Sequence, residues 1–223
     1  ADYLSSNDEG GFITALLEGQ PDAPLYFSRM KRQNKMGPAL LGKRLELREF
    51  KASDLVDKIN KDFAFIDTRK REDYLKGAVK GSLHLPDGKK FITYASYILD
   101  PEKDLKPIVL LAANEIEATR LRARLSFVGI DHVVGFITSL EGLKLEPVPT
   151  ISLKDFETLE RPFILDVRTA NEYDAGHIET AKQLHVGRVV YKLSELPKDE
   201  TLITHCQSGA RATVAVSALR AAG

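Results

Sequence analysis

The chain has 223 residues, with 32 basic and 32 acidic side chains and a single cysteine. A balanced charge gives no electrostatic reason to expect a nucleic-acid or anionic-membrane partner. No apolar run is long enough to be a membrane span. One cysteine cannot form an internal disulfide, and disulfides mark oxidising compartments, so we expect a cytoplasmic protein. The length allows two modest domains.

Residues 1–45 differ in pattern from the rest of the chain. A short amphipathic helix is predicted at 10–19, followed by prolines, the aromatic pair Tyr26-Phe27 and a basic run. The stretch lacks the alternation of apolar and polar residues that would indicate a strand. It is too short to bury a hydrophobic core by itself.

From residue 46 onward, short apolar strands alternate with helices. This alternation predicts a parallel sheet with helices on its faces. The expected elements are a helix at 51–60, a strand at 63–69, a helical turn at 70–77, a strand at 106–113, a helix at 114–129 and a strand at 131–136.

The same order then returns. The second set comprises a helix at 151–160, a strand at 162–168, a helical turn at 169–176, and a strand and helix at 201–223. An internal repeat indicates two copies of one α/β unit. We expect an N-terminal unit at 46–145 and a C-terminal unit at 146–223, with residues 143–150 as the linker between the copies.

The two copies end differently. The first continues into its strand at 131–136, whereas the second stops at Gly223. We therefore expect the C-terminal unit to be truncated. A chain that begins at Ala1 inside ordinary folded sequence is likewise expected to be a fragment or a processed product.

The stretch THCQSGAR (204–211) places the cysteine, Cys206, between an apolar strand and a helix rich in small residues. The first N–H groups of a helix lack intrahelical partners and favour an anion. Gly209 lets the backbone bend inward, and Arg211 adds a permanent positive charge. These features favour a thiolate, which is the nucleophilic form of cysteine.

Cys206 and its neighbour His205 each also have a purely structural interpretation. A free cysteine is often simply a buried apolar residue. For Cys206 the turn position, the glycine and the arginine together outweigh that interpretation. The neighbouring His205 would point to the opposite face of the strand, so it is expected to be a core or supporting residue rather than a base.

At this point the C-terminal unit resembles the rhodanese family of sulfurtransferases. Three motifs carry the resemblance, in order: a strand end Asp166-Val167-Arg168, a stretch from Glu172 through Gly176-His177-Ile178 to Ala181, and a loop with four residues between Cys206 and Arg211. The first copy is similar, with Asp67-Thr68-Arg69 at the matching strand end. The resemblance implies an α/β fold of two rhodanese-like domains, each a mostly parallel sheet with helices on both faces.

The resemblance also implies roles for individual residues. Cys206 would be the catalytic nucleophile that carries sulfur as a persulfide. The substrate-binding loop would be Gln207, Ser208, Gly209, Ala210 and Arg211. Supporting roles would belong to Asp166, Arg168 and His177, with Asp166 and Arg168 expected as an ion pair that fixes the loops.

The first copy lacks the chemical residues of this loop. Gapless pairing of the repeats sets Ala112 against Cys206, Glu115 against Gly209 and Glu117 against Arg211. A carboxylate at that position would repel an anionic substrate. We therefore expect the N-terminal unit to be structural or a docking surface.

Residues 1–45 are similar to the C-terminal tail of the metallo-β-lactamase-fold domain in metallo-β-lactamase–rhodanese fusion proteins. In such fusions the first domain can be a persulfide dioxygenase with iron. The H-x-H-x-D-H metal motif is absent from this chain, and its five histidines lack metal-ligand spacing. We expect no metal or cofactor in this chain, with iron only in the missing domain of a sulfide- and persulfide-metabolising fusion enzyme.

The expected partners are small-molecule sulfur donors and acceptors and the metallo-β-lactamase-fold domain of the same parent chain. Neither nucleic acid nor membrane is expected, and a homo-oligomer is possible although the oligomeric state stays open. Two other functions compete. A dual-specificity-type cysteine phosphatase also ends a strand with His-Cys, but it has five residues between cysteine and arginine, whereas this loop has four. A non-catalytic scaffold is disfavoured by the intact loop of the second copy.

Overall fold

The computed structural model describes residues 8–18, 23–24, 26–37 and 46–223. Before residue 46 it contains two helices, α1 (Glu9–Leu17) and α2 (Tyr26–Met36), neither of which buries a residue. Arg29 of α2 donates a 2.5 Å hydrogen bond to the carbonyl of Gly129, which lies just after the end of α5. The helix predicted at 10–19 is present as α1, and the aromatic pair and the basic run lie in α2. Residues 1–7, 19–22, 25 and 38–45 lie outside the described residues.

A five-stranded parallel sheet forms the N-terminal unit, in the order β1-β6-β5-β2-β4. Its strands are β1 (Arg48–Glu49), β2 (Ala64–Asp67), β4 (Leu83–His84), β5 (Ile108–Leu111) and β6 (Val133–Ile137). Its α-helices are α3 (Arg71–Lys76), α4 (Phe91–Ile98) and α5 (Glu115–Ser126). All four residues of β5 are buried, as expected for a central parallel strand covered on both faces.

The helix predicted at 51–60 is wrong. Only the short 3₁₀ helix η2 (Ala52–Leu55) forms there. Asp57 and Asn60 have φ angles of 61° and 66°, in the left-handed region, and two such residues cannot continue a right-handed helix.

A three-stranded parallel sheet forms the C-terminal unit, in the order β10-β8-β9. Its strands are β8 (Phe163–Asp166), β9 (Lys182–Gln183) and β10 (Leu202–His205). Its helices are α6 (Leu153–Phe156), α7 (Ala170–Asp174), η3 (Val186–Tyr191), η4 (Leu193–Glu195) and α8 (Ala210–Ala222). The helix predicted at 151–160 is limited to α6, because the chain after Phe156 closes tight turns instead.

The two sheets have matching parts. The order β10-β8-β9 corresponds to β5-β2-β4, and among residues 46–223 the second sheet has no counterpart of β6 or β1. In the first sheet Arg69 pairs with Asp67 at 2.7 Å and donates to the carbonyl of Gly77. Arg168 pairs with Asp166 in the same way in the second sheet, at 2.6 Å.

The segment between the sheets is not a free linker. Its strand β7 (Leu145–Glu146) pairs antiparallel with β3 (Ala78–Val79) of the N-terminal unit. Val148 is buried beside this pair, in a small cluster with Tyr74 and Ala78. The segment therefore continues the packing of the N-terminal unit up to the start of the C-terminal unit.

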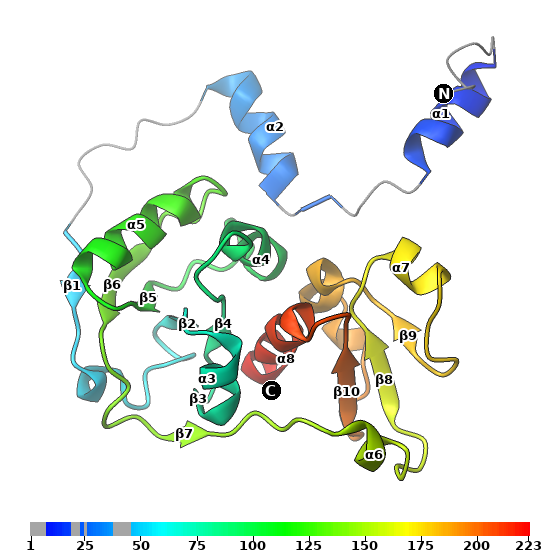
Figure 1. The fold of residues 1–223 in the computed structure, drawn as a ribbon. Coiled ribbons are helices and arrows are strands. Elements are labelled where there is room, and N and C mark those ends of the chain that lie inside the picture. The colour runs from blue at the N-terminus through cyan, green and yellow to red at the C-terminus, as the bar shows by residue number, and fades with distance from the viewer. Residues whose placement is uncertain (1–7, 19–22, 25, 38–45) are drawn as a thin grey trace.

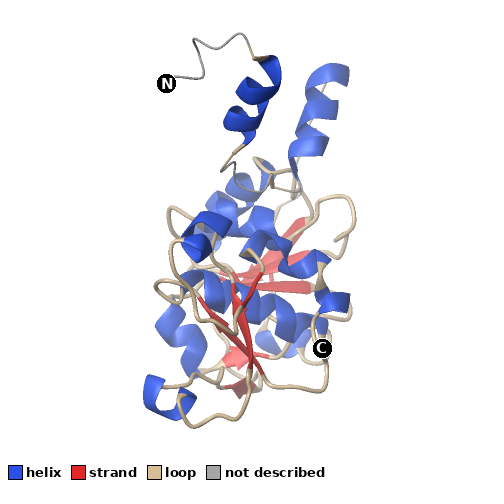
Figure 2. Ribbon diagram, turned by 90° about the vertical axis from the view of Figure 1, so that its right-hand side faces the viewer, coloured by secondary structure: helices blue, strands red, loops and turns tan. Residues whose placement is uncertain are grey.

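Helix α8 packs between the two sheets (Figure 1), and the turned view of Figure 2 shows helices around the strands. One hydrophobic core joins side chains of both units, and its members include Phe91, Ala95, Ile98, Leu110, Val186, Val189, Val214, Ala215 and Ala218. A helix that is buried on several sides belongs to the interior of a structure, and the alanines of α8 let neighbouring elements approach closely. No described helix is long and apolar enough to cross a membrane.

The shared core yields a prediction about Ala215, which has no exposed surface. Replacement of Ala215 by Leu adds side-chain volume where the two units meet and should lower the free energy of unfolding by about 1–3 kcal/mol. Urea unfolding followed by circular dichroism measures this loss. Ala222→Leu, in the exposed last turn of α8, is the control and should change stability little. An unchanged urea midpoint for the Ala215 variant would contradict the described packing of α8.

Candidate functional site

The candidate site is the loop between β10 and α8. Strand β10 ends at His205, Cys206 follows, and α8 begins at Ala210. Gly209 is the residue before the helix and has φ = 84° and ψ = −14°, a left-handed conformation that glycine adopts without a Cβ clash. The loop can therefore turn sharply from the strand into the helix while Cys206 faces the helix N-terminus.

The sulfur of Cys206 accepts two backbone hydrogen bonds. The N–H of Gly209 donates to Sγ at 3.2 Å and the N–H of Ala212 at 3.4 Å. Ala212 is the third residue of α8, so its N–H has no partner within the helix. The sulfur thus occupies the place of a helix-capping acceptor. Ala212 was missed by the sequence analysis, since its contribution is a backbone N–H and not a side chain.

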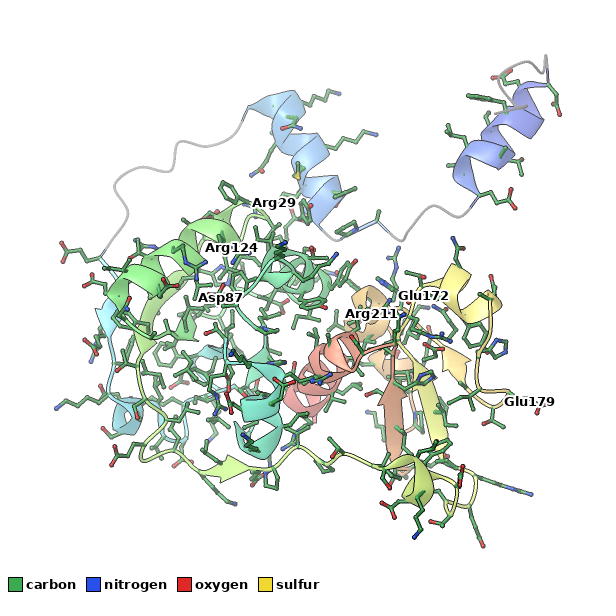
Figure 3. The ribbon with its side chains drawn as sticks, in the orientation of Figure 1. Arg29, Asp87, Arg124, Glu172, Glu179 and Arg211 are labelled. Carbon is green, nitrogen blue, oxygen red and sulfur yellow. The ribbon has the colours of Figure 1, made fainter. Side chains whose placement is uncertain are left out.

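Arg211 does not stand as an unpaired cation at this loop. Its guanidinium donates two hydrogen bonds to the carboxylate of Glu172 in α7, at 2.6 and 2.7 Å (Figure 3). The hydrogen bond with Glu172 raises the pKa of Arg211, and a charge at Cys206 contributes less. The expected role in loop rigidity has a direct structural basis in this pair, while the role in anion binding stays a prediction.

Glu172 was not predicted as a site residue. The hydrogen bonds from Arg211 hold the pKa of Glu172 well below its usual range, against the opposing effect of burial. Glu172 also accepts from the N–H and hydroxyl of Thr169, which forms a capping box at the start of α7. The spacing Thr-x-x-Glu could have revealed the cap. The pairing with Arg211, 39 residues away, has no such local signal.

The predicted ion pair of Asp166 and Arg168 is present. Asp166 is fully buried, and although burial raises the pKa of its carboxyl, the hydrogen bonds from Arg168 outweigh this and lower it. Arg168 also donates to the carbonyl of Gly176, which ties the loop after α7 to the end of β8. The pair therefore fixes two of the chain segments around the site.

His205 lies beside this pair, as expected for a supporting residue. Its Nε2 is 3.4 Å from Oδ2 of Asp166, and burial lowers the pKa of the imidazole despite the nearby carboxylate. His177 is exposed, with its ring stacked on Tyr173 at 3.7 Å and its Nδ1 2.8 Å from the carbonyl of Tyr173. These contacts suit the predicted role of His177 in tying its loop.

The other predicted loop residues lie at the surface. Gln207 and Ser208 are exposed, and Ala210 is half-buried in the first turn of α8. Among the described residues, no group of three or more His, Cys, Asp or Glu side chains could hold a metal ion. The absence of a metal from this chain stays a prediction.

The matching loop of the N-terminal unit is built differently. It begins at Ala112 and reaches the helix cap, Asn114, one residue sooner than the Cys206 loop does. The side chain of Asn114 accepts from the N–H of Glu117 at 2.9 Å, so the third N–H of α5 is already occupied. The predicted gapless pairing of Glu117 with Arg211 is therefore wrong, because Glu117 is the third residue of α5, as Ala212 is of α8. The Glu117 carboxylate pairs with Arg120 at 2.9 Å, which offsets its negative charge.

The Glu172–Arg211 pair yields a prediction for stability. Because Arg211 loses a charged acceptor, Glu172→Gln should lower the free energy of unfolding at pH 7 by about 1–3 kcal/mol. The folded-state pKa of Glu172 is depressed, so its contribution is present above the unfolded value of about 4.3 and is lost as the pH falls below it.

Urea unfolding at pH 7, 5 and 4 measures this effect. The stability difference between parent and Glu172→Gln should shrink toward pH 4, since the unfolded chain binds the proton first. Asp174→Asn, at the end of the same helix, serves as the control for a lost carboxylate. A difference between parent and Glu172→Gln that stays constant or grows on acidification would contradict the pairing.

Comparisons with known proteins show similarity over parts of the chain. Residues 152–223 match the family model of the rhodanese-like domain. A sulfurtransferase of Allochromatium vinosum is 36% identical over 64 residues, which cover 29% of this chain and 60% of the relative. A metallo-beta-lactamase structure from Staphylococcus aureus is 25% identical, with a TM-score of 0.46, over 60% of this chain and 36% of that one. A thiosulfate sulfurtransferase from Pseudomonas aeruginosa is 18% identical, with a TM-score of 0.32, over 87% of this chain and 43% of that one.

The chain thus spans 60% of the length of the curated relative and 36% of the Staphylococcus aureus chain. The matched residues include β8, α7, β10 and α8, together with the Cys206 loop. The predicted resemblance of the C-terminal unit to rhodanese-like domains is therefore confirmed over residues 152–223.

Proposed function

We propose that this protein is a sulfurtransferase in which Cys206 carries the sulfur as a persulfide. The observation that carries the proposal is the convergence of the Gly209 and Ala212 N–H groups on the Cys206 sulfur. Two backbone donors aimed at one sulfur stabilise negative charge there, as an oxyanion hole does at oxygen. The match of residues 152–223 to the rhodanese-like domain supports the same chemistry.

The reaction has two redox-neutral exchange steps. The Cys206 thiolate attacks the outer sulfur of thiosulfate, the sulfur–sulfur bond of thiosulfate breaks, and sulfite leaves with the bonding electron pair. Sulfite, cyanide or a thiol then attacks the outer sulfur of the persulfide, and the Cys206 thiolate is the leaving group. A low-molecular-weight persulfide could replace thiosulfate as the donor. Such covalent exchange predicts ping-pong kinetics.

The residues around Cys206 divide this work. The loop N–H groups stabilise the anionic sulfur, and Gly209 gives the loop the turn that aims them. The pair of Arg211 with Glu172 holds the start of α8 against α7. The buried pair of Asp166 with Arg168 holds the end of the neighbouring strand.

We extend the proposal to the rest of the chain. The N-terminal unit is a second, catalytically inactive rhodanese-like domain, supported by its matching strand order and its equivalent Asp67–Arg69 pair. Residues 1–45 belong to the tail of a metallo-β-lactamase-fold domain in a cytoplasmic fusion enzyme of persulfide metabolism, supported by the sequence resemblance of that stretch. Any iron would belong to that domain.

The direct test is sulfur loading of Cys206. Incubation with thiosulfate should increase the intact mass by one sulfur atom, and peptide mapping should place that atom on Cys206. Cys206→Ser should abolish both loading and transfer to cyanide, because a hydroxyl is a much poorer acceptor of sulfane sulfur. Its stability should stay within about 1 kcal/mol of the parent, since the change is nearly isosteric.

Folded protein that takes no sulfur at any residue would overturn the proposed function. Turnover of thiosulfate by Cys206→Ser at the rate of the parent would show that Cys206 is not the nucleophile. Hydrolysis of an aryl phosphate by the parent, lost in Cys206→Ser, would favour the phosphatase alternative instead.

The inactive state of the N-terminal loop can be tested by Ala112→Cys in a Cys206→Ser background. The N–H of Glu117 is already bonded to Asn114, which takes the helix-cap position of Gly209 with an extended backbone in place of the left-handed turn. Without the donors that this turn aims at the sulfur, transfer should stay at least about 100-fold below that of the parent. Alkylation of the new thiol by iodoacetamide is the control for its accessibility. Activity near the parent level would show that this loop is already competent.

A further inference from the structure

Two residues of the N-terminal unit border the Cys206 loop. Arg71, the first residue of α3, donates from Nη1 to the carbonyl of Ser208, across 137 positions of the sequence. The contact is close, because a Cβ added to Gly209 would collide with the Arg71 guanidinium. The loop that holds the nucleophile is thus contacted by a cation from the other unit.

Tyr94 of α4 is close enough to the same loop for the charges of Cys206 and Arg211 to act on it. Its ring and Cys206 both pack against the core shared by the two units, and α4 contacts α8 directly. Burial raises the pKa of Tyr94, charge at Cys206 raises it further, and Arg211 lowers it. Among the described residues, no group accepts a hydrogen bond from the Tyr94 hydroxyl, which leaves its proton available to a ligand.

The charges around the loop indicate which arginine can bind an incoming anion. The guanidinium of Arg211 is held by the Glu172 carboxylate through two short hydrogen bonds, so its charge is largely compensated. Arg71 is paired with Glu72 at 3.1 Å, but the Glu72 side chain is 61% exposed and such pairs are weak in water. Arg71 is therefore the cation better able to turn toward an anion that arrives at the loop.

We propose that Arg71 and Tyr94 select sulfur donors with a strongly anionic leaving part, so that the N-terminal unit completes the active site of the C-terminal unit. The inference rests on the proposed sulfurtransferase function. In the first exchange step, sulfite must leave carrying two negative charges. A guanidinium and a phenolic O–H beside the loop stabilise that leaving group and the donor from which it comes.

The test compares two donors with the same outer sulfur. Thiosulfate carries two negative charges, whereas methanethiosulfonate carries one and has a methyl group in place of an oxygen. Arg71→Gln should lower kcat/KM for thiosulfate about tenfold, mainly through KM, as expected for one lost charged hydrogen bond. The same change should lower kcat/KM for methanethiosulfonate no more than about threefold, because that donor presents less charge.

Matched variants separate these effects from general damage. Lys76→Gln, at the other end of α3, removes an equal charge from a side chain that is 77% exposed, and should leave both donors unaffected. Tyr94→Phe removes only the hydroxyl and should lower kcat/KM for thiosulfate about fivefold. Tyr97→Phe, on the same helix, is its control and should change the preference between donors little.

The outcomes separate the inference from the function on which it rests. If the parent takes sulfur from neither donor, the proposed function fails and the inference fails with it. If the parent is active and Arg71→Gln lowers kcat/KM equally for both donors, Arg71 only holds the loop through Ser208. The inference is then overturned. If neither Arg71→Gln nor Tyr94→Phe changes the ratio of the two donors, the N-terminal unit contributes nothing to donor selection.

Discussion

The packing of α8 between two sheets is the constraint on which the rest of the structure depends. Six of its residues, from Ala212 to Ala218, are buried, and its neighbours come from both units. A helix held on several sides cannot shift without opening a close-packed core. This packing therefore fixes the N-terminus of α8. It also fixes the direction of the Ala212 N–H, which donates to the Cys206 sulfur.

Charged side chains near the N-terminus of α8 form ion pairs with one another. Asp166 is buried with Arg168, and Glu172 holds Arg211. The buried Asp166 carboxylate would be costly without a partner, so its pair with Arg168 stabilises the fold as well as the candidate site. The loop itself supplies mainly backbone N–H groups as donors to an anion. The cation able to respond to a substrate comes from the other unit, through the contact of Arg71 with Ser208.

The two units share a strand order, β5-β2-β4 and β10-β8-β9, but differ in the loop that follows the first strand of each. The Asp–Arg pair at the strand end is present in both, because it fixes loops whatever the chemistry. The loops differ in the features that only chemistry requires. In α5 the third N–H donates to the side chain of Asn114, whereas in α8 the third N–H donates to the sulfur of Cys206. Function thus lies in the loop and not in the fold that carries it.

The sequence by itself determined the strand–turn–helix at Cys206, the need for Gly209 and the Asp166–Arg168 pair, because each depends on residues close together in the chain. It also indicated the repeat through its hydrophobic pattern. Only the tertiary structure decided that Glu172 holds Arg211, that Arg71 reaches Ser208 and that 51–60 forms only a 3₁₀ turn. Periodicity reports which residues a segment can bury, but the packing of distant segments decides which surfaces meet, and no local pattern records that choice.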